Sequence, residues 1–101
     1  MLITLPFMPD FEQPMLLAKK TATSRTRKYG EVGDTFHAFS HTFVLIAILE
    51  ITLQAVAINF YPMEGFSSPQ EFIDCWKRIH PRRGWQPDQQ IYFHIFRCIS
   101  A

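Results

Sequence analysis

The chain has 101 residues and a formal net charge of +1, and 48% of its residues are hydrophobic. This length suits one domain and is too short for two, so we expect a single domain over residues 1–101. The apolar content, with ten phenylalanines, is enough for one compact core and excludes a chain that is disordered throughout. A net charge this small does not by itself indicate nucleic acid.

Cysteine and histidine spacing argues against a metal site and against a disulfide scaffold. Cys75 and Cys98 form no CxxC motif, and the four histidines stand singly along the chain. The most apolar run, residues 43–58, is short for a membrane span and contains Glu50. The first residues lack a charged segment and soon reach Pro6, unlike a signal peptide. We therefore expect a cytoplasmic protein with reduced thiols, no cofactor, no metal and no membrane partner.

The first quarter of the chain predicts a strand, a short helix and a second strand. Residues 2–5 suit a strand, which Pro6 ends because proline has no N–H to donate. Residues 9–17 predict a short helix that Pro14 interrupts. The β-branched residues that follow favour an extended chain over residues 21–25.

The middle of the chain predicts a turn, two paired strands and a helical turn. Two glycines and an aspartate mark a turn over residues 29–34. Residues 35–39 suit a strand, and the continuous apolar run at 43–49 favours a buried strand paired with it across a short turn at 40–42. Residues 53–59 predict a short helical turn.

The clearest local signal is a helix that begins after Ser68. Ser68 as N-cap, Pro69 at the first helical position and Glu71 at the third form a capping box. Cations occupy the last turn, where they favour the helix dipole, and Pro81 ends the helix. The apolar face is made of Phe72, Cys75, Trp76 and Ile79.

The last predicted element is a strand over residues 90–99. Large side chains alternate onto both of its faces, as in a central or barrel strand. Together the elements predict an α+β fold: a small β-barrel of about five strands with two or three short flanking helices.

Two basic clusters are candidates for binding an anionic ligand. The first, residues 19–27, holds four cations and four hydroxyls, and arginine and lysine both suit phosphate. The second follows the predicted helix, where a tryptophan beside two arginines can stack on a base. A solvated basic loop is the competing interpretation of the first cluster. The candidate ligand-binding residues are Lys19, Arg25, Arg27, Arg82, Arg83 and Trp85.

Lys20, Thr23 and Glu64 are the candidate catalytic residues. A lysine beside a threonine hydroxyl can act as a base when burial and nearby cations favour its neutral form. A carboxylate facing that pair can supply the acid or base of an acyl transfer. In a regular strand Thr23 and Arg25 share one face and Lys20 points to the other, so a turn or bulge has to bring Lys20 round. The plainer interpretations are a Lys20 that reaches solvent at a barrel rim and a solvated Glu64.

Taken in order, these pieces resemble an ASCH domain of the PUA-like superfamily. The resemblance covers nearly the whole chain and implies a small β-barrel with a cleft lined by residues 20–25. The superfamily is associated with binding RNA or modified nucleosides. The matching pieces are residues 18–25 (AKKTATSR), 32–34 (VGD), 64–66 (EGF), 71–72 (EF), 76–80 (WKRIH) and the closing aromatic strand.

Within this family, small bacterial amidohydrolases remove acyl groups from the N4 atom of cytidine with a Lys, a Thr and a Glu. The resemblance implies that these roles fall on Lys20, Thr23 and Glu64. Thr23 would attack the acyl carbonyl with Lys20 as base, and Glu64 would handle protons on the leaving amine.

We therefore expect an ASCH domain that binds RNA or a modified nucleoside in a basic cleft. The first alternative is an N4-acylcytidine amidohydrolase that uses the Lys/Thr/Glu set. The second alternative is a protein-interaction module that uses apolar surface around Trp85. The sequence does not fix the oligomeric state, for which a monomer is the simplest expectation.

Overall fold

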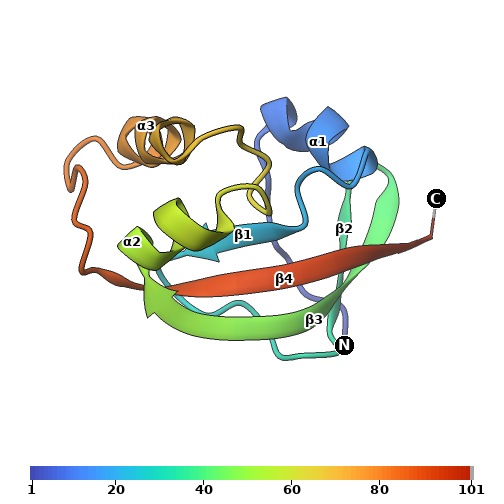
Figure 1. Cartoon of the computed structure of the whole chain (residues 1–101). Coiled ribbons are helices and arrows are strands. Elements are labelled where there is room, and N and C mark those ends of the chain that lie inside the picture. The colour runs from blue at the N-terminus through green and yellow to red at the C-terminus, as the bar shows by residue number, and fades with distance from the viewer. Residues whose placement is uncertain (101) are drawn as a thin grey trace.

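The computed structural model describes residues 1–100, in which a four-stranded antiparallel sheet curls into a half-barrel with the helices on one side (Figure 1). The strand order is β1-β4-β3-β2. This is an α+β fold, as expected. The strands are β1 (Ala22–Arg25), β2 (Thr35–Ala38), β3 (His41–Thr52) and β4 (Gln90–Ser100). The helical elements are η1 (Pro9–Phe11), α1 (Glu12–Leu16), α2 (Leu53–Ala55), η2 (Val56–Phe60) and α3 (Pro69–Ile79).

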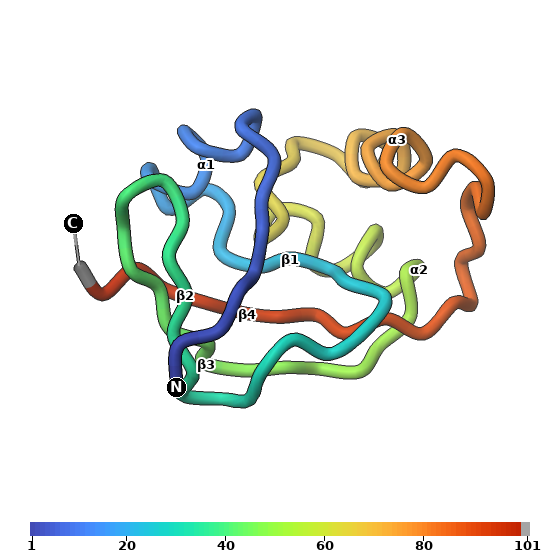
Figure 2. Tube along the Cα trace, turned by 180° about the vertical axis from the view of Figure 1, so that it is seen from behind, coloured from blue at the N-terminus to red at the C-terminus, as the bar shows by residue number. Residues whose placement is uncertain are grey.

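The expected strand over residues 2–5 is absent from residues 1–100, which contain four strands and not five. Leu2 makes one isolated parallel bridge with Thr35, and pairing stops there. Leu5 instead inserts its side chain into the core, where it is 2% exposed. The segment therefore crosses from the side of β2 towards α1 rather than running along β2 (Figure 2).

The β2–β3 hairpin confirms the predicted pairing, but its turn lies one residue earlier than expected. Phe39 and Ser40 occupy the turn with φ values of 53° and 65°. His41 and Thr42, expected in the turn, already pair with Ala38 and His37. Two consecutive residues with positive φ match the right-handed twist of the flanking strands, which is why so short a turn suffices.

Strand β4 is central, as its bulky residues on both faces predicted. It pairs with β1 along one edge and with β3 along the other. Phe93 faces the helices and Phe96 faces the opposite core, and both are buried. A register shift in β3 between Leu45 and Ala47 adds curvature to the sheet.

Two clusters of buried side chains hold these layers together. The first lies between the sheet and the helical layer and consists of Ala22, Leu53, Val56, Ala57, Phe72, Trp76, Ile91 and Phe93. The second lies under the N-terminal segment and consists of Leu5, Met15, Phe36, Phe43, Leu45 and Phe96. Strand β1 is the edge strand next to α3, so its outer residues are available to form a site.

Helix α3 begins as the capping signal predicted. The Ser68 side chain accepts a hydrogen bond from the Glu71 backbone N–H at 3.2 Å. The Glu71 side chain reaches back one residue further than in a standard capping box and accepts from the Ser67 N–H. Pro14 falls in the first turn of α1, where its missing N–H has no partner to lose, so it does not prevent the helix.

The helices found in residues 1–100 are all too short or too polar to cross a bilayer.

Candidate functional site

A cavity of about 290 Å³ lies between β1 and α3. Side chains from three separate parts of the chain line it: the N-terminal segment, the stretch from Lys20 to Tyr29, and residues 64–80. Its aromatic walls are formed by Phe7, Phe11, Tyr29, Phe66, Phe72, Trp76 and His80. Its polar and charged lining includes Lys20, Thr23, Ser24, Arg25, Thr26 and Glu64.

Backbone pairing brings Lys20 and Glu64 together. The two residues form an isolated antiparallel bridge, and the N–H groups of Thr21 and Ala22 both donate to the Met63 carbonyl. Gly65 then turns the chain with a φ of 94°, a conformation that other residues rarely adopt. The segment before α3 is thus fixed against the start of β1.

The Lys20 ammonium group is buried and fully hydrogen-bonded. Its Nζ donates to Glu64 Oε1 at 2.9 Å, to the Ala22 carbonyl at 2.9 Å and to the Glu64 carbonyl at 3.2 Å. The Lys20 and Glu64 side chains are 2% and 5% exposed. The Phe11 ring covers the ammonium at 4.4 Å. Because a lysine ammonium has three protons, these three acceptors use all of its donors. Lys20 therefore does not reach solvent at a rim.

Ser24 is the second partner of Glu64. Its Oγ donates to Glu64 Oε2 at 2.5 Å, so the two carboxylate oxygens have different partners. Lys20 and Ser24 are an even number of residues apart, and in an extended chain such residues face the same side. We had expected a turn or bulge to bring Lys20 to the face of Thr23. Lys20 instead meets Glu64 on the face of Ser24, for which a regular extended chain suffices.

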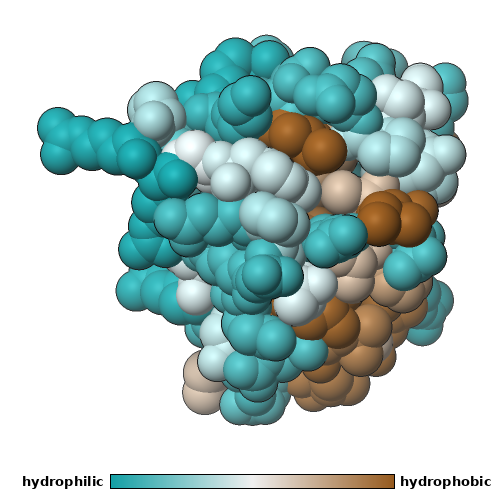
Figure 3. Space-filling model, turned by 60° about the vertical axis from the view of Figure 1, so that its left-hand side comes forward, coloured by the Kyte–Doolittle hydropathy of each residue, from teal (hydrophilic) through white to brown (hydrophobic). Residues whose placement is uncertain are grey.

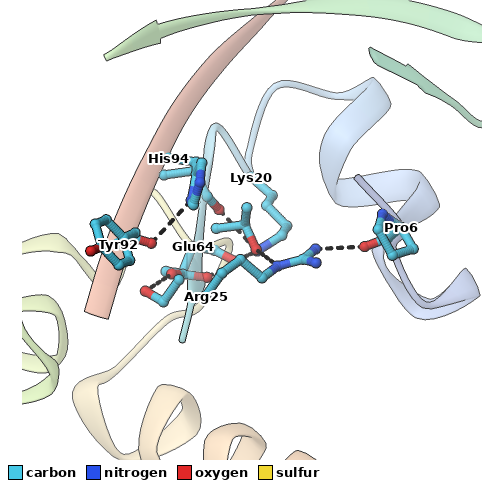
Figure 4. A network of polar contacts seen from close by, with 9 residues as sticks. Pro6, Lys20, Arg25, Glu64, Tyr92 and His94 are labelled. Carbon is cyan, nitrogen blue, oxygen red and sulfur yellow. Dashed lines mark hydrogen bonds and ion pairs between the residues drawn. The ribbon is translucent and has the colours of Figure 1, made fainter. Parts of the chain in front are cut away.

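Arg25 and Thr23 face the other side of β1, as the strand period predicted. Arg25 Nε donates to Thr23 Oγ1 at 3.2 Å, and Nη2 donates to the Pro6 carbonyl at 2.5 Å (Figure 4). The guanidinium carbon lies 5.0 Å from the centre of the Phe7 ring and 5.5 Å from that of Tyr29. Burial lowers the pKa of Arg25, while Tyr29 and Glu64 oppose that shift.

His94 is on β4, where it pairs with Thr23 of β1, and it is completely buried. Its Nε2 accepts from the Tyr29 N–H at 2.9 Å, and its Nδ1 lies 3.0 Å from the Tyr92 carbonyl. These partners require a neutral ring with the proton on Nδ1. Burial lowers the pKa of His94, and the positive charge of Arg25 adds to this effect. His94 is therefore part of the core that supports the cavity and does not line it.

The far wall contains two rings in close contact, Trp76 on α3 and His80 at its C-terminal end, inclined to each other by 34°. The Trp76 and His80 ring centres are 4.1 Å apart. The Trp76 Nε1 atom is buried and has no hydrogen-bond partner within residues 1–100, an uncommon situation for an indole N–H. Burial, and then the charge of Arg83, lowers the pKa of His80.

The structure brings Lys20, Thr23, Arg25 and Glu64 to one cavity and leaves the other candidates outside its wall. Trp85, expected to be exposed, is half-buried and packs edge-on against Phe72 at 6.1 Å. The two basic clusters do not both line the cavity. The candidate binding cations that are exposed and lie outside the wall are Lys19, Arg27, Arg82 and Arg83.

Sequence reasoning missed Ser24, Trp76 and His80 as lining residues. The signal for Ser24 was its even spacing from Lys20, because that spacing places both on the face that meets Glu64. Trp76 is a core residue, only 4% exposed, as its place on the apolar face of the predicted helix suggests, but it also lines the cavity. No local pattern reveals that His80, at the helix end, faces β1.

Some apolar side chains remain exposed away from the cavity. Figure 3 shows one face of the molecule on which apolar residues gather in one area among hydrophilic ones. Exposed large apolar residues include Ile46 and Leu49 on β3 and Ile58 on η2. Within residues 1–100, no group of three or more His, Cys, Asp or Glu side chains is placed to hold a metal ion.

The fold is similar to that of solved ASCH structures. An ASCH domain from Lactobacillus crispatus superposes with a TM-score of 0.73 at 11% identity, over 88% of this chain and 70% of that chain. A mutant ASCH protein from Zymomonas mobilis gives 0.65 at 16% identity, over 98% and 75%. A protein from Enterococcus faecalis described by the family model DUF984 gives 0.65 at 15% identity, over 87% and 66%. By sequence, the chain matches no protein-family model and, at a significant level, no curated protein. These likenesses confirm the expected ASCH resemblance at the level of the fold.

Proposed function

From the ASCH fold and the cavity between β1 and α3, we propose that the chain binds a nucleoside, free or as part of RNA. The observation that carries the proposal is the cavity itself, which combines aromatic walls with buried polar groups. At about 290 Å³ it is at the small end of ligand pockets, so it suits one nucleoside and not an oligonucleotide.

The chemistry of the walls supports a flat, polar ligand. Aromatic rings favour stacking on a base, and the Trp76 and His80 rings, which contact each other in the cavity wall, offer ring surfaces of that kind. Two of the five N–H groups of Arg25 are committed to protein oxygens, which leaves donors for a ligand oxygen.

The test is a titration of the purified protein with cytidine, uridine, adenosine, guanosine and N4-acetylcytidine, followed by calorimetry. We expect saturable binding of at least one of them. Replacing Arg25 by alanine is expected to weaken it about tenfold or more, because a hydrogen bond from a charged donor is lost. An Arg25→Lys variant keeps the positive charge but loses the planar guanidinium with its paired N–H donors. It therefore separates the contribution of the charge from that of the hydrogen-bond geometry. The absence of binding to all five nucleosides and to RNA would contradict the proposal.

Arg82→Ala provides the matched control, because Arg82 is exposed and lies outside the cavity wall. Its effect on nucleoside affinity is expected to be less than twofold. If the ligand is part of RNA, the same variant is expected to weaken binding of a short single-stranded RNA and to reduce the salt dependence. An RNA affinity that does not change with salt would restrict the proposal to free nucleosides.

A second candidate function is hydrolysis of N4-acylated cytidine. It is favoured by the arrangement of Lys20, Thr23 and Glu64, which all line the one cavity. The test is incubation with N4-acetylcytidine and chromatography of the released cytidine. We expect Glu64→Gln to abolish release while Ser67→Ala, an exposed serine outside the wall, leaves it unchanged. Release that persists in Glu64→Gln would exclude the proposed site.

A further inference from the structure

The two oxygens of the Glu64 carboxylate have different hydrogen-bond partners. Oε1 is held by the buried Lys20 ammonium at 2.9 Å, while Oε2 accepts the proton of Ser24 Oγ at 2.5 Å. Ser24 is only partly buried and lines the cavity. A hydroxyl that faces a cavity and donates to an oriented carboxylate has the geometry of a nucleophile beside its base.

We propose that Ser24 is the nucleophile of an acyl transfer in this cavity, with Glu64 as its general base and Lys20 as a positioning residue. The proposal deepens the second candidate function and rests on it for the choice of substrate. Lys20 contacts no acyl group in this scheme, since its role is to fix the Glu64 carboxylate and to balance its charge.

The contacts of Thr23 and Lys20 favour this assignment over a Thr23 nucleophile. Thr23 Oγ1 accepts a hydrogen bond from Arg25 Nε at 3.2 Å, on the face of β1 that does not meet Glu64. Lys20 Nζ is surrounded by three oxygen acceptors, the Ala22 carbonyl, the Glu64 carbonyl and Glu64 Oε1, so its hydrogen-bonding positions are occupied by groups other than the Thr23 hydroxyl. The hydroxyl with a base in contact is that of Ser24.

The proposed reaction balances with water as the co-reactant. Ser24 Oγ bonds to the acyl carbon as its proton passes to Glu64 Oε2. The bond from the acyl carbon to the amine nitrogen then breaks, and Glu64 returns the proton to that nitrogen, which leaves as the free amine. Water attacks the acyl-serine while Glu64 takes its proton, the carboxylic acid leaves, and the proton returns to Ser24.

Arg25 is the cation that can stabilise the oxyanion of this reaction. It lines the same cavity, and its Nε and Nη2 atoms donate to Thr23 Oγ1 and to the Pro6 carbonyl, with the Tyr29 side chain as a neutral neighbour. Its positive charge is not balanced by a hydrogen-bonded carboxylate, unlike that of Lys20. A fixed donor of this kind stabilises negative charge as it develops.

The experiment identifies the acylated residue directly. The protein is mixed with N4-acetylcytidine, or with the activated ester p-nitrophenyl acetate, quenched in acid and digested for peptide mass mapping. We expect one acetyl group on Ser24. We expect Ser24→Ala to lower turnover of N4-acetylcytidine by about 10³-fold or more while its affinity changes only a few-fold. Ser24→Thr, which keeps a hydroxyl, is expected to restore part of the turnover, a result that a purely structural role would not give.

Two further variants keep the test decisive. In Thr23→Val the acetyl group is expected on Ser24 as in the wild type, because the hydrogen bond to Glu64 Oε2 comes from Ser24 while the Thr23 hydroxyl accepts from Arg25. Ser67→Ala controls for the loss of an unrelated serine. An acetyl group found on Thr23, or turnover that survives in Ser24→Ala and disappears in Thr23→Val, would overturn the inference and leave the hydrolase proposal standing.

The same experiment can also show that the nucleophile is right and the substrate wrong. If p-nitrophenyl acetate acetylates Ser24 but N4-acetylcytidine is not cleaved, the nucleophile stands and the proposed substrate fails. A wild-type protein that neither becomes acetylated nor releases cytidine overturns both.

Discussion

The Oε1 atom of Glu64 lies 2.9 Å from the Nζ atom of Lys20, and the two side chains are 5% and 2% exposed. This ion pair is set between β1 and the segment that leads into α3. Both side chains are almost completely shielded from bulk water, so each charge is stabilised largely by the other. The pair therefore links the stability of the fold to the integrity of the cavity.

Removing one member of this pair is expected to destabilise the protein by about 3–5 kcal/mol, because the remaining charge stays buried without its partner. Lys20→Met and Glu64→Gln are the single variants, measured by urea denaturation. The double variant leaves no buried carboxylate and no buried ammonium, so its loss should be smaller than the sum of the two single losses. Losses that simply add would show that the two side chains do not interact.

The buried His94 predicts that stability falls as the pH is lowered. Its pKa is lowered in the folded protein, chiefly by burial, from the ordinary value of 6.5. Below about pH 6.5 the unfolded chain therefore binds more protons than the folded chain, and the free energy of unfolding decreases as the pH falls. For one group the slope cannot exceed about 1.4 kcal/mol per pH unit. Denaturation curves between pH 7.5 and pH 5 measure it.

His94→Gln isolates this contribution, since a glutamine amide offers a donor and an acceptor but does not titrate. The variant should have a flatter stability profile over that range. His80→Gln should flatten it less, because His80 is only partly buried, although its pKa is lowered too. An unchanged profile in His94→Gln would contradict the assignment of a neutral, buried ring.

Gly65→Ala is expected to disturb the site through Lys20. Gly65 has a φ of 94°, and a Cβ placed there would lie 3.1 Å from the Lys20 Cβ atom. Gly33 has a nearly equal φ of 96° with nothing within 4 Å of such a Cβ, so Gly33→Ala measures the backbone strain alone. We expect about 1–2 kcal/mol for Gly33→Ala and a larger loss for Gly65→Ala, with nucleoside binding reduced only in the latter. Equal losses would mean that Lys20 moves aside without cost.

The elements that the sequence predicted correctly carry strong local signals. Ser68 and Glu71 fix the start of α3 by hydrogen bonds within a few residues. The pairing of β2 with β3 follows from one short turn, and the central place of β4 follows from bulky side chains on both faces. Such features depend on neighbours along the chain and so can be read from it.

The errors arose where distant contacts decide. Leu5 packs into the core and does not pair with a neighbouring strand, so only a single bridge at Leu2 remains of the expected first strand. Trp85 lies in a loop that reads as exposed, yet Phe72 offers its ring an apolar neighbour. The hydrogen bond between Ser24 and Glu64 joins residues forty positions apart. The even spacing of Ser24 from Lys20 is consistent with it, but no local motif predicts it.

The central place of β4 in the sheet also determines when the strands can pair during synthesis. β4 lies between β1 and β3 in space, yet the ribosome makes it after both. Until residues 90–100 emerge, β1 has no neighbouring strand and β3 has only β2. From the completion of β3 until β4 emerges, the nascent chain therefore presents the unpaired edge of a largely apolar strand. Chaperone binding to arrested nascent chains should be strong before this stretch emerges and weak afterwards.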